Sequence, residues 1–390
     1  MKRSPSHHRV AVLSRHLAGP AATMVPAAAT TTDPVFLVGS MIADVQAELS
    51  ETGTPSFRMD VANQASSVGK VTHTAGGVCL NIARALRALG TGPVHLVSAV
   101  GPDASGRELL EVCSEAGICT KGVLTIRNGR TATVLCLFNH RGEVVFSLAD
   151  VSILEDHVTP AMALNCMARC EYSGGIVVTD GDLPSEVLKT VCSRSRTEGC
   201  TVVFDPATVG KAPRCLECLQ DIDFLFPNVD ELREISDAIY MSKGRDRGPV
   251  REQLPLCACG VPEVFHLCVP AVTAVLGRGV RHVVLTAGEH GAGMYWYRGT
   301  ALELMYCPAL PVPIIASVSG AGDCLVAGFV RSLSLGRRKE EALALGVASA
   351  WEALQTKSNV PSAPGFDGAR LAANAWLLES RIIKCAHGKK

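Results

Sequence analysis

A short glycine-rich run that ends in an acid is the feature of this sequence best suited to chemistry. Residues 320–323 read Gly-Ala-Gly-Asp and precede an apolar stretch typical of a helix. Glycines let the backbone approach a ligand closely, and the free N–H groups at a helix start bind anions. Such an anion hole stabilises the charge on a transferring phosphoryl group. We interpret Gly320, Ala321 and Gly322 as this hole, and Asp323 as the general base that takes the proton of an attacking hydroxyl. The alternative is a tight turn with an acidic helix cap.

Two upstream segments carry groups suited to binding a sugar. Gly76 and Gly77 open a second predicted helix, and Asn81 follows one turn later, where its amide can bind hydroxyls. Asp44 follows the first predicted strand, and a carboxylate there can accept hydrogen bonds from two adjacent hydroxyls. The alternatives are a turn before a capped core helix for the glycine pair and a solvated loop acid for Asp44.

Short apolar runs closed by a polar residue or glycine recur along the chain and alternate with helical patterns. Runs of this kind are typical of parallel strands covered on both faces. The expected strands are 35–39, 94–101, 175–180, 200–205, 224–228 and 282–288. The alternation predicts an α/β sandwich with a mostly parallel sheet. Ligands bind such sheets beyond the carboxyl ends of the strands, so the acids that follow the strands, including Asp180 and Asp205, are expected to converge on one crevice. A further β-like stretch is expected at 313–316.

The chain divides into a main domain and appendages. Residues 1–33 are basic with no acid before Asp33, which indicates a targeting or disordered extension. The domain is expected over 34–365, with a tail at 366–390. Alternating patterns at about 45–75 and 130–148 predict a small β lid, the second segment being a hairpin. Residues 241–262 lack periodicity and are expected to form a surface insertion.

Composition excludes several classes of function. Lys+Arg and Asp+Glu both number 37, so no net charge attracts nucleic acid or a membrane surface. No apolar run reaches the roughly 18 residues of a membrane span. The 16 cysteines favour buried free thiols over a disulfide framework. A zinc site at Cys215-x-x-Cys218 or Cys257-x-Cys259 is the alternative.

Together these motifs, in this order, resemble the ribokinase-like (PfkB) carbohydrate kinase family from about residue 35 to about 361. Asn228 and Glu231 match its Asn-x-x-Glu element, which organises Mg²⁺ and phosphate. Thr286, Gly288 and Gly291 match its nucleotide-binding Thr-x-Gly-x-x-Gly. The resemblance implies a three-layer α/β/α sandwich with a β lid, ATP and Mg²⁺ as cofactors, and often K⁺. It also implies pairing of lids into a homodimer.

Within that family, two segments of the sequence are similar to those of the pseudouridine kinases. Residues 69–78 and 204–211 carry this likeness, and so does the absence of the Asp that usually precedes the Gly-Ala-Gly-Asp run. The implied reaction is phosphorylation of the 5′-hydroxyl of pseudouridine. Thr131 and Asp180 are then expected to contact substrate, and Lys211 phosphate. A structural Thr131 and a solvated Lys211 are the alternatives. A ribokinase or other nucleoside kinase is the second hypothesis for the whole chain, and a non-catalytic nucleotide-binding relative is the third.

The basic extension contains a segment that resembles an organelle-targeting signal. Residues 9–17 read Arg-Val, five residues, then His-Leu, which resembles the type-2 peroxisomal targeting nonapeptide. A peroxisome or related organelle is therefore expected, with a cytoplasmic or a mitochondrial location as the alternatives.

Overall fold

The computed structural model describes residues 33–49, 69–139, 144–170, 174–242, 260–361, 366 and 368–387. The expected targeting segment and most of the expected insertion lie outside these residues. None of the helices in the described ranges is long and apolar enough to cross a membrane.

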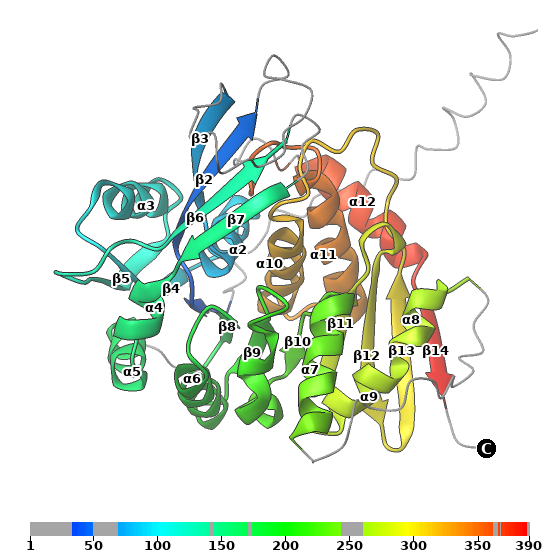
Figure 1. Ribbon diagram of the computed structural model, residues 1–390. Coiled ribbons are helices and arrows are strands. Elements are labelled where there is room, and N and C mark those ends of the chain that lie inside the picture. The colour runs from blue at the N-terminus through cyan, green and yellow to red at the C-terminus, as the bar shows by residue number, and fades with distance from the viewer. Residues whose placement is uncertain are drawn as a thin grey trace, which may run out of the picture. The chain divides into compact units, whose positions relative to one another are not determined.

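A ten-stranded sheet forms the centre of the domain (Figure 1), in the order β14-β13-β12-β11-β10-β9-β8-β1-β4-β5. In this sheet β5, β4, β1, β8, β9, β10 and β11 run parallel to one another. Strands β12, β13 and β14 extend the sheet in antiparallel fashion beyond β11. The strands are β1 (Val35–Val38), β4 (Val94–Val100), β5 (Cys119–Thr125), β8 (Ile176–Asp180), β9 (Thr201–Asp205), β10 (Phe224–Leu225), β11 (His282–Thr286), β12 (Ala292–Arg298), β13 (Ala301–Cys307) and β14 (Ile383–His387). The predicted parallel strands are confirmed.

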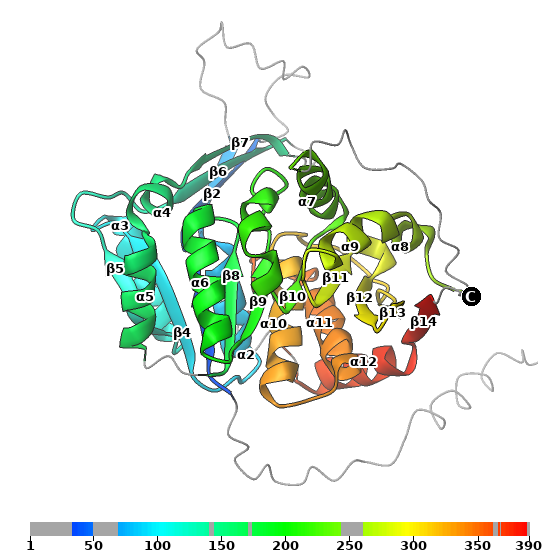
Figure 2. The ribbon, with the colours of Figure 1, turned by 90° about the horizontal axis from the view of Figure 1, so that it is seen from below.

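Helices cover both faces of this sheet (Figure 2) because successive strand residues point to opposite sides. In β1, Phe36 and Val38 pack into one apolar cluster, whereas Val35 and Leu37 pack into the other. The first cluster includes α4 (Ser152–His157), α5 (Pro160–Arg169), α6 (Ser185–Thr197), α7 (Val229–Met241), α8 (Glu263–Leu267) and α9 (Val269–Leu276). The second includes α2 (Val78–Ala88), α3 (Ala104–Glu115), α10 (Ala321–Ser334), α11 (Lys339–Ala353) and α12 (Gly368–Ser380). The predicted three-layer α/β/α sandwich is therefore present.

The predicted lid is a separate four-stranded sheet in the order β3-β2-β6-β7. Its strands are β2 (Ile42–Leu49), β3 (Gly69–Gly76), β6 (Thr133–Phe138) and β7 (Val144–Asp150). Strands β6 and β7 form the expected antiparallel hairpin, and β2 pairs with β6 in parallel. Asp44 lies on β2, so this lid strand carries the residue that is expected to bind the sugar.

Two sequence predictions are corrected by the structure. Residues 313–316 are not a strand: they belong to an exposed loop, in which Ile314 is 78% exposed. Residues after 365 are not a simple tail, because α12 packs on the core and β14 pairs with β13 in the main sheet. Residues 313–316 and the segment after 365 are short or lack a clear hydrophobic periodicity. Their conformation is therefore decided by the elements that they contact in the folded protein.

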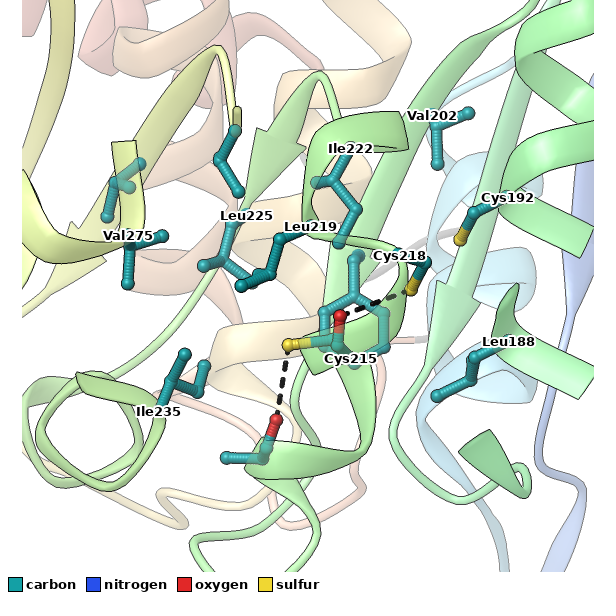
Figure 3. Packing of buried hydrophobic residues seen from close by; sticks show 14 of the residues in the cluster. Leu188, Cys192, Val202, Cys215, Cys218, Leu219, Ile222, Leu225, Ile235 and Val275 are labelled. Atoms are coloured by element: carbon teal, nitrogen blue, oxygen red, sulfur yellow. Dashed lines mark hydrogen bonds between the residues drawn. The ribbon is translucent and has the colours of Figure 1, made fainter. Parts of the chain in front are cut away.

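The Cys215-x-x-Cys218 pair lies inside the hydrophobic core (Figure 3). The Cys215 thiol donates to the carbonyl of Ala212 at 3.2 Å, and the Cys218 thiol donates to the carbonyl of Cys215 at 3.4 Å. Burial raises the pKa of the Cys215 thiol well above its usual range, which keeps it protonated. The geometry agrees with the interpretation of these cysteines as buried thiols.

The order of the parallel strands reverses between β1 and β8, the position where such sheets bind ligands. Asp180, at the end of β8, is fully buried there. Its Oδ2 accepts hydrogen bonds from the Ser40 amide at 2.8 Å, the Ser40 hydroxyl at 2.7 Å and the Cys79 amide at 3.2 Å. Its Oδ1 accepts from the Asp182 amide at 3.1 Å. Asp180 thus joins the end of β1, the start of α2 and the end of β8.

We expect Asp180→Ala to destabilise the domain by about 3 kcal/mol, because it leaves several buried amides without an acceptor. Urea denaturation measures the change in the free energy of unfolding. Asp156→Ala, at an exposed position of α4, is the matched control and should be near neutral. Equal midpoints for the two variants would show that the Asp180 hydrogen bonds contribute little.

Candidate active site

A cleft of about 190 Å³ lies at the carboxyl ends of the parallel strands. Its lining includes Asp205, Asn228, Glu231, Thr286, Gly322 and Asp323. The structure therefore brings the Gly-Ala-Gly-Asp run together with the two predicted nucleotide motifs. These motifs are far apart in the sequence, and their convergence follows from the parallel sheet.

Asp323 stands in the first turn of α10, which the left-handed Gly320 precedes with a φ of 77°. A methyl group at Gly320 would overlap the backbone carbonyl oxygen of Asn359, so only glycine fits there. The first N–H groups of α10 have no acceptor within the helix, so this end can bind an anion. The predicted anion hole therefore has a suitable backbone geometry.

The Asp323 carboxylate accepts a hydrogen bond from the side-chain amide of Asn81 at 2.8 Å. Burial raises the pKa of Asp323 to about 7 against the effect of this hydrogen bond, and the charges of Asp180 and Asp44 add to the rise. A carboxylate with a pKa near neutrality is well suited to accept a proton from a hydroxyl. The Oδ1 atom of Asn81 is buried and has no hydrogen-bond partner among the described residues.

Asn228 and Glu231 form a capping box at the start of α7. The Asn228 side chain accepts from the Glu231 amide at 2.9 Å, and the Glu231 carboxylate accepts from the Asn228 amide at 2.9 Å. The Asn-x-x-Glu spacing therefore has a structural function, the capping of α7, which is distinct from the predicted binding of Mg²⁺ and phosphate. Burial raises the pKa of Glu231, whose carboxylate also faces the cleft.

Thr286 ends β11 beside Asn228, with which it makes an isolated bridge. Gly288 opens a single turn of 3₁₀-helix (Gly288–His290), and Gly291 follows with a φ of 89°. A side chain at Gly291 would overlap the carbonyl of Cys307 on β13. These glycines make the tight reversal between β11 and β12, and this reversal leaves Thr286 in the cleft wall.

Asp44 lies beside the same site, held by two contacts. Its Oδ2 accepts a hydrogen bond from the Asn359 side-chain amide at 2.9 Å, and its carboxylate packs directly on Gly76. Burial raises the pKa of Asp44 to about 6, whereas the Asn359 hydrogen bond lowers it. Gly77, with a φ of 92°, lies against the Ser40 carbonyl and starts α2, which carries Asn81. The glycine pair, Asp44 and Asn81 are thus adjacent to Asp323.

Three predicted ligands have protein partners in this structure. Asp180 is enclosed as described above, so we now interpret it as an organiser of the strand ends. Thr131 is buried; its hydroxyl donates to Asp103 at 2.6 Å and accepts from the Gly101 amide at 2.9 Å, which favours the structural alternative. Lys211 forms an ion pair with Asp182 at 2.5 Å, so it is not the solvated lysine of the alternative.

Asn359 is a site residue that no sequence motif marks. It lies 315 positions from Asp44, and no motif surrounds it. Asp205 was predicted only as one of several strand-end acids. Burial, together with Asp323 and Glu231, raises its pKa well above the usual range. The alternation of strands and helices and the family-like segment 204–211 are the two sequence signals that include Asp205.

The cleft is rich in acids and poor in positive charge. None of the described residues that line it is Lys or Arg. Within the described ranges, no three His, Cys, Asp or Glu side chains could together hold a metal ion. A divalent cation here would therefore keep most of its water and contact one or two carboxylates, as Mg²⁺ commonly does.

A family model for pfkB family carbohydrate kinases matches residues 32–364. The chain belongs to the pfkB family of carbohydrate kinases. It is therefore a phosphotransferase whose acceptor is a hydroxyl group. This kinase is 27% identical to the pseudouridine kinase of Arabidopsis thaliana over 370 residues, 84% of this chain and 92% of that protein.

Two further comparisons agree with the family. The pseudouridine kinase of Escherichia coli (strain K12) is 27% identical over 296 residues, 76% of this kinase and 82% of that protein. The structure of Arabidopsis thaliana ribokinase complexed with ribose and ATP has a TM-score of 0.69 at 20% identity. It covers 88% of this kinase and 99% of that chain, and the likeness shows that the fold is ribokinase-like.

The raised carboxyl pKa values predict how the stability of this kinase depends on pH. The pKa of Asp323 is near 4 in the unfolded chain, and burial raises it to about 7 in the folded state, so the folded state holds an extra proton between these pH values. The contribution of this bound proton to the free energy of unfolding is fully present below pH 4 and is lost as the pH rises through 7. His282 acts oppositely, because burial lowers its pKa to about 4.

Comparison with Asp323→Asn cancels the effect of His282, which is common to both proteins, and leaves the contribution of Asp323 and of its repulsion with Asp205. The free energy of unfolding of the wild type, minus that of Asp323→Asn, should decrease from pH 5 to pH 8 when no nucleotide or divalent cation is added. Denaturant titrations at each pH measure it. A difference that increases with pH would contradict a raised pKa at Asp323.

Proposed function

We propose that this kinase transfers the γ-phosphoryl group of ATP to the 5′-hydroxyl of pseudouridine. The observation that carries the proposal is the position of Asp323, which lies at the N-terminus of α10, in the cleft and within reach of Asn81. The similarity to two pseudouridine kinases over most of the chain supports the choice of substrate.

In the proposed mechanism, the sugar binds between the lid strand β2 and the start of α2. The Asp44 carboxylate accepts hydrogen bonds from the ribose hydroxyls, and the Oδ1 of Asn81, which has no partner in the described part of the chain, accepts another. This arrangement directs the 5′-hydroxyl toward Asp323. Asp323 accepts the hydroxyl proton as the oxygen attacks the γ-phosphorus and the bond to the leaving ADP oxygen breaks.

The anion hole at 320–322 stabilises the charge on the transferring group. ATP is proposed to lie against Thr286 in the cleft wall and to reach Gly288, which starts the turn after β11, with its phosphates toward α10. The cleft offers two carboxylates, Glu231 of the Asn-x-x-Glu match and Asp205, that would hold a hydrated Mg²⁺, whereas the Asn228 side-chain oxygen caps α7. The ion would supply positive charge that the described lining lacks.

Phosphorylation of free ribose is the second candidate function. The groups proposed to bind sugar, Asp44, Gly76 and Asn81, all address the ribose and none addresses a base. The same site would therefore accept ribose. The intact Asp323 and its glycines disfavour a non-catalytic relative.

A substrate panel separates these functions. ATP-dependent phosphorylation of pseudouridine, uridine and ribose, measured side by side, should give the highest kcat/KM for pseudouridine. A preference for ribose would favour the second candidate, and phosphorylation of none of the three would overturn both.

Replacing Asp323 tests the catalytic assignment. Asp323→Asn keeps the shape but cannot accept the proton, so kcat should decrease on the order of 10³-fold with little change in KM. Asp156→Asn on α4 serves as the exposed control and should retain wild-type kcat. Near-normal turnover by Asp323→Asn on every substrate in the panel would show that another group is the base.

The lid is also proposed to pair two copies of the chain. Asp44 places one lid face toward the site, and the opposite face is apolar. On that face Val71, Ala47, Leu137 and Phe146 form one cross-strand row, and Val45, Leu135 and Leu148 lie in the next, which His73 completes on β3. Val71 is 60% exposed and Leu148 is 59% exposed. A contiguous exposed apolar patch indicates an interface, and a two-fold axis would bury it against its own copy.

Leu148→Lys should shift the protein from dimer to monomer, because a lysine would be desolvated at the centre of this interface. Light scattering coupled to size exclusion measures the mass. Met241→Lys is the matched control, since Met241 is 64% exposed at the end of α7, away from the lid sheet. A monomeric wild type, or a Leu148→Lys variant that stays dimeric, would contradict the proposed interface.

A further inference from the structure

Asn359 is the residue whose two ends contact the two halves of the site. It lies in the segment after α11 and is 3% exposed. Its side-chain amide donates to Asp44 Oδ2 at 2.9 Å, whereas its backbone carbonyl packs on Gly320. The first contact reaches the lid strand that carries the proposed sugar acid. The second reaches the first residue of the anion hole.

The contact with Gly320 is too close to be incidental. A methyl group at Gly320 would overlap the carbonyl oxygen of Asn359, so the Cα of the glycine lies directly on the backbone of residue 359. Gly320 also has a positive φ, which glycine alone adopts without strain. A displacement of residue 359 therefore moves the N-terminus of α10, because no flexible side chain separates the two.

The segment around Asn359 is braced by its own side chains. The Thr356 hydroxyl donates to the Ser358 carbonyl at 2.9 Å, and the Ser358 hydroxyl donates to the Val360 carbonyl at 2.9 Å. The Ala316 amide donates to the Leu354 carbonyl at 2.8 Å, which ties this segment to the loop that leads into the anion hole. The segment can therefore transmit a shift at one end to the other.

We propose that Asn359 is a positioning residue that couples sugar binding at Asp44 to phosphate binding at 320–322. The proposal rests on the proposed function, because it assumes these two roles. A sugar that engages Asp44 fixes the Asn359 side chain, and through its backbone the helix start that receives the γ-phosphate. ATP binding fixes the same segment from the other side. Each substrate therefore tightens the binding of the other, by the same factor in both directions.

Calorimetry measures this coupling directly. The dissociation constant of pseudouridine is determined with and without a non-hydrolysable ATP analogue and Mg²⁺. For the wild type, the ratio of the dissociation constant without the analogue to that with it should be roughly five or more, because the ternary complex is favoured. Asn359→Ala should bring the ratio close to one while the thermal midpoint changes little. Ser358→Ala, which removes a bond within the segment but leaves the Asp44 contact, should keep the ratio.

Exchanging the two side chains at positions 44 and 359 tests whether the loss of coupling comes from their hydrogen bond rather than from a general disturbance of the structure. Asn359→Asp places two acids together and should abolish the coupling, whereas Asn359→Asp combined with Asp44→Asn restores a donor and an acceptor at these positions. The double variant should recover the ratio even though its sugar affinity is weaker. This test also remains available if Asn359→Ala does not fold.

Two results would overturn the proposal. One is a wild-type ratio near one, and the other is a ratio that Asn359→Ala leaves unchanged. Failure of the proposed function is recognised separately, because wild-type protein would then neither bind nor phosphorylate pseudouridine. In that case the same ratio is measured with whichever sugar the wild type phosphorylates.

Discussion

A carboxylate buried where the strand order reverses is the constraint on which the site depends. Asp180 accepts hydrogen bonds from Ser40, Cys79 and Asp182, which belong to three separate segments. Ser40 leads into the lid strand and Cys79 lies at the start of α2. The positions of Asp44 and Asn81 are thereby fixed relative to the central sheet. An acid serves here because one oxygen can accept several donors at once.

The second property of the site is its excess of negative charge. Asp44, Asp180 and Asp323 all have raised pKa values, largely because burial disfavours the charged form. Lys211 forms an ion pair with Asp182 and so balances the charge of that acid. The same environment that makes Asp323 an effective base is unfavourable for a polyphosphate. The cleft therefore suits a nucleotide that arrives together with its own cations.

Much of this arrangement could be predicted from the sequence because it rests on local signals. Apolar runs closed by glycine or an acid marked the parallel strands, and the glycine motifs marked the helix starts at Gly77 and Gly320. What could not be predicted depends on contacts between distant segments. Nothing local distinguishes Asn359 or the paired state of Lys211, and β14 is a strand only because β13 lies beside it. Residues 313–316 show the converse, since a β-like composition without a partner remained a loop.

Side chains along β2 point alternately to the two faces of the lid sheet, and this limits insertions and deletions within the strand. Asp44 faces the site and Val45 faces the opposite side, so the two neighbours serve different surfaces. An insertion or deletion of one residue before Asp44 in β2 would place Ala43 or Val45, respectively, where the sugar acid belongs. Indels of an even number would preserve the faces but shift the acid away from Asn359. We therefore expect length variation among relatives to be absent from this strand and to gather in the connections between strands instead.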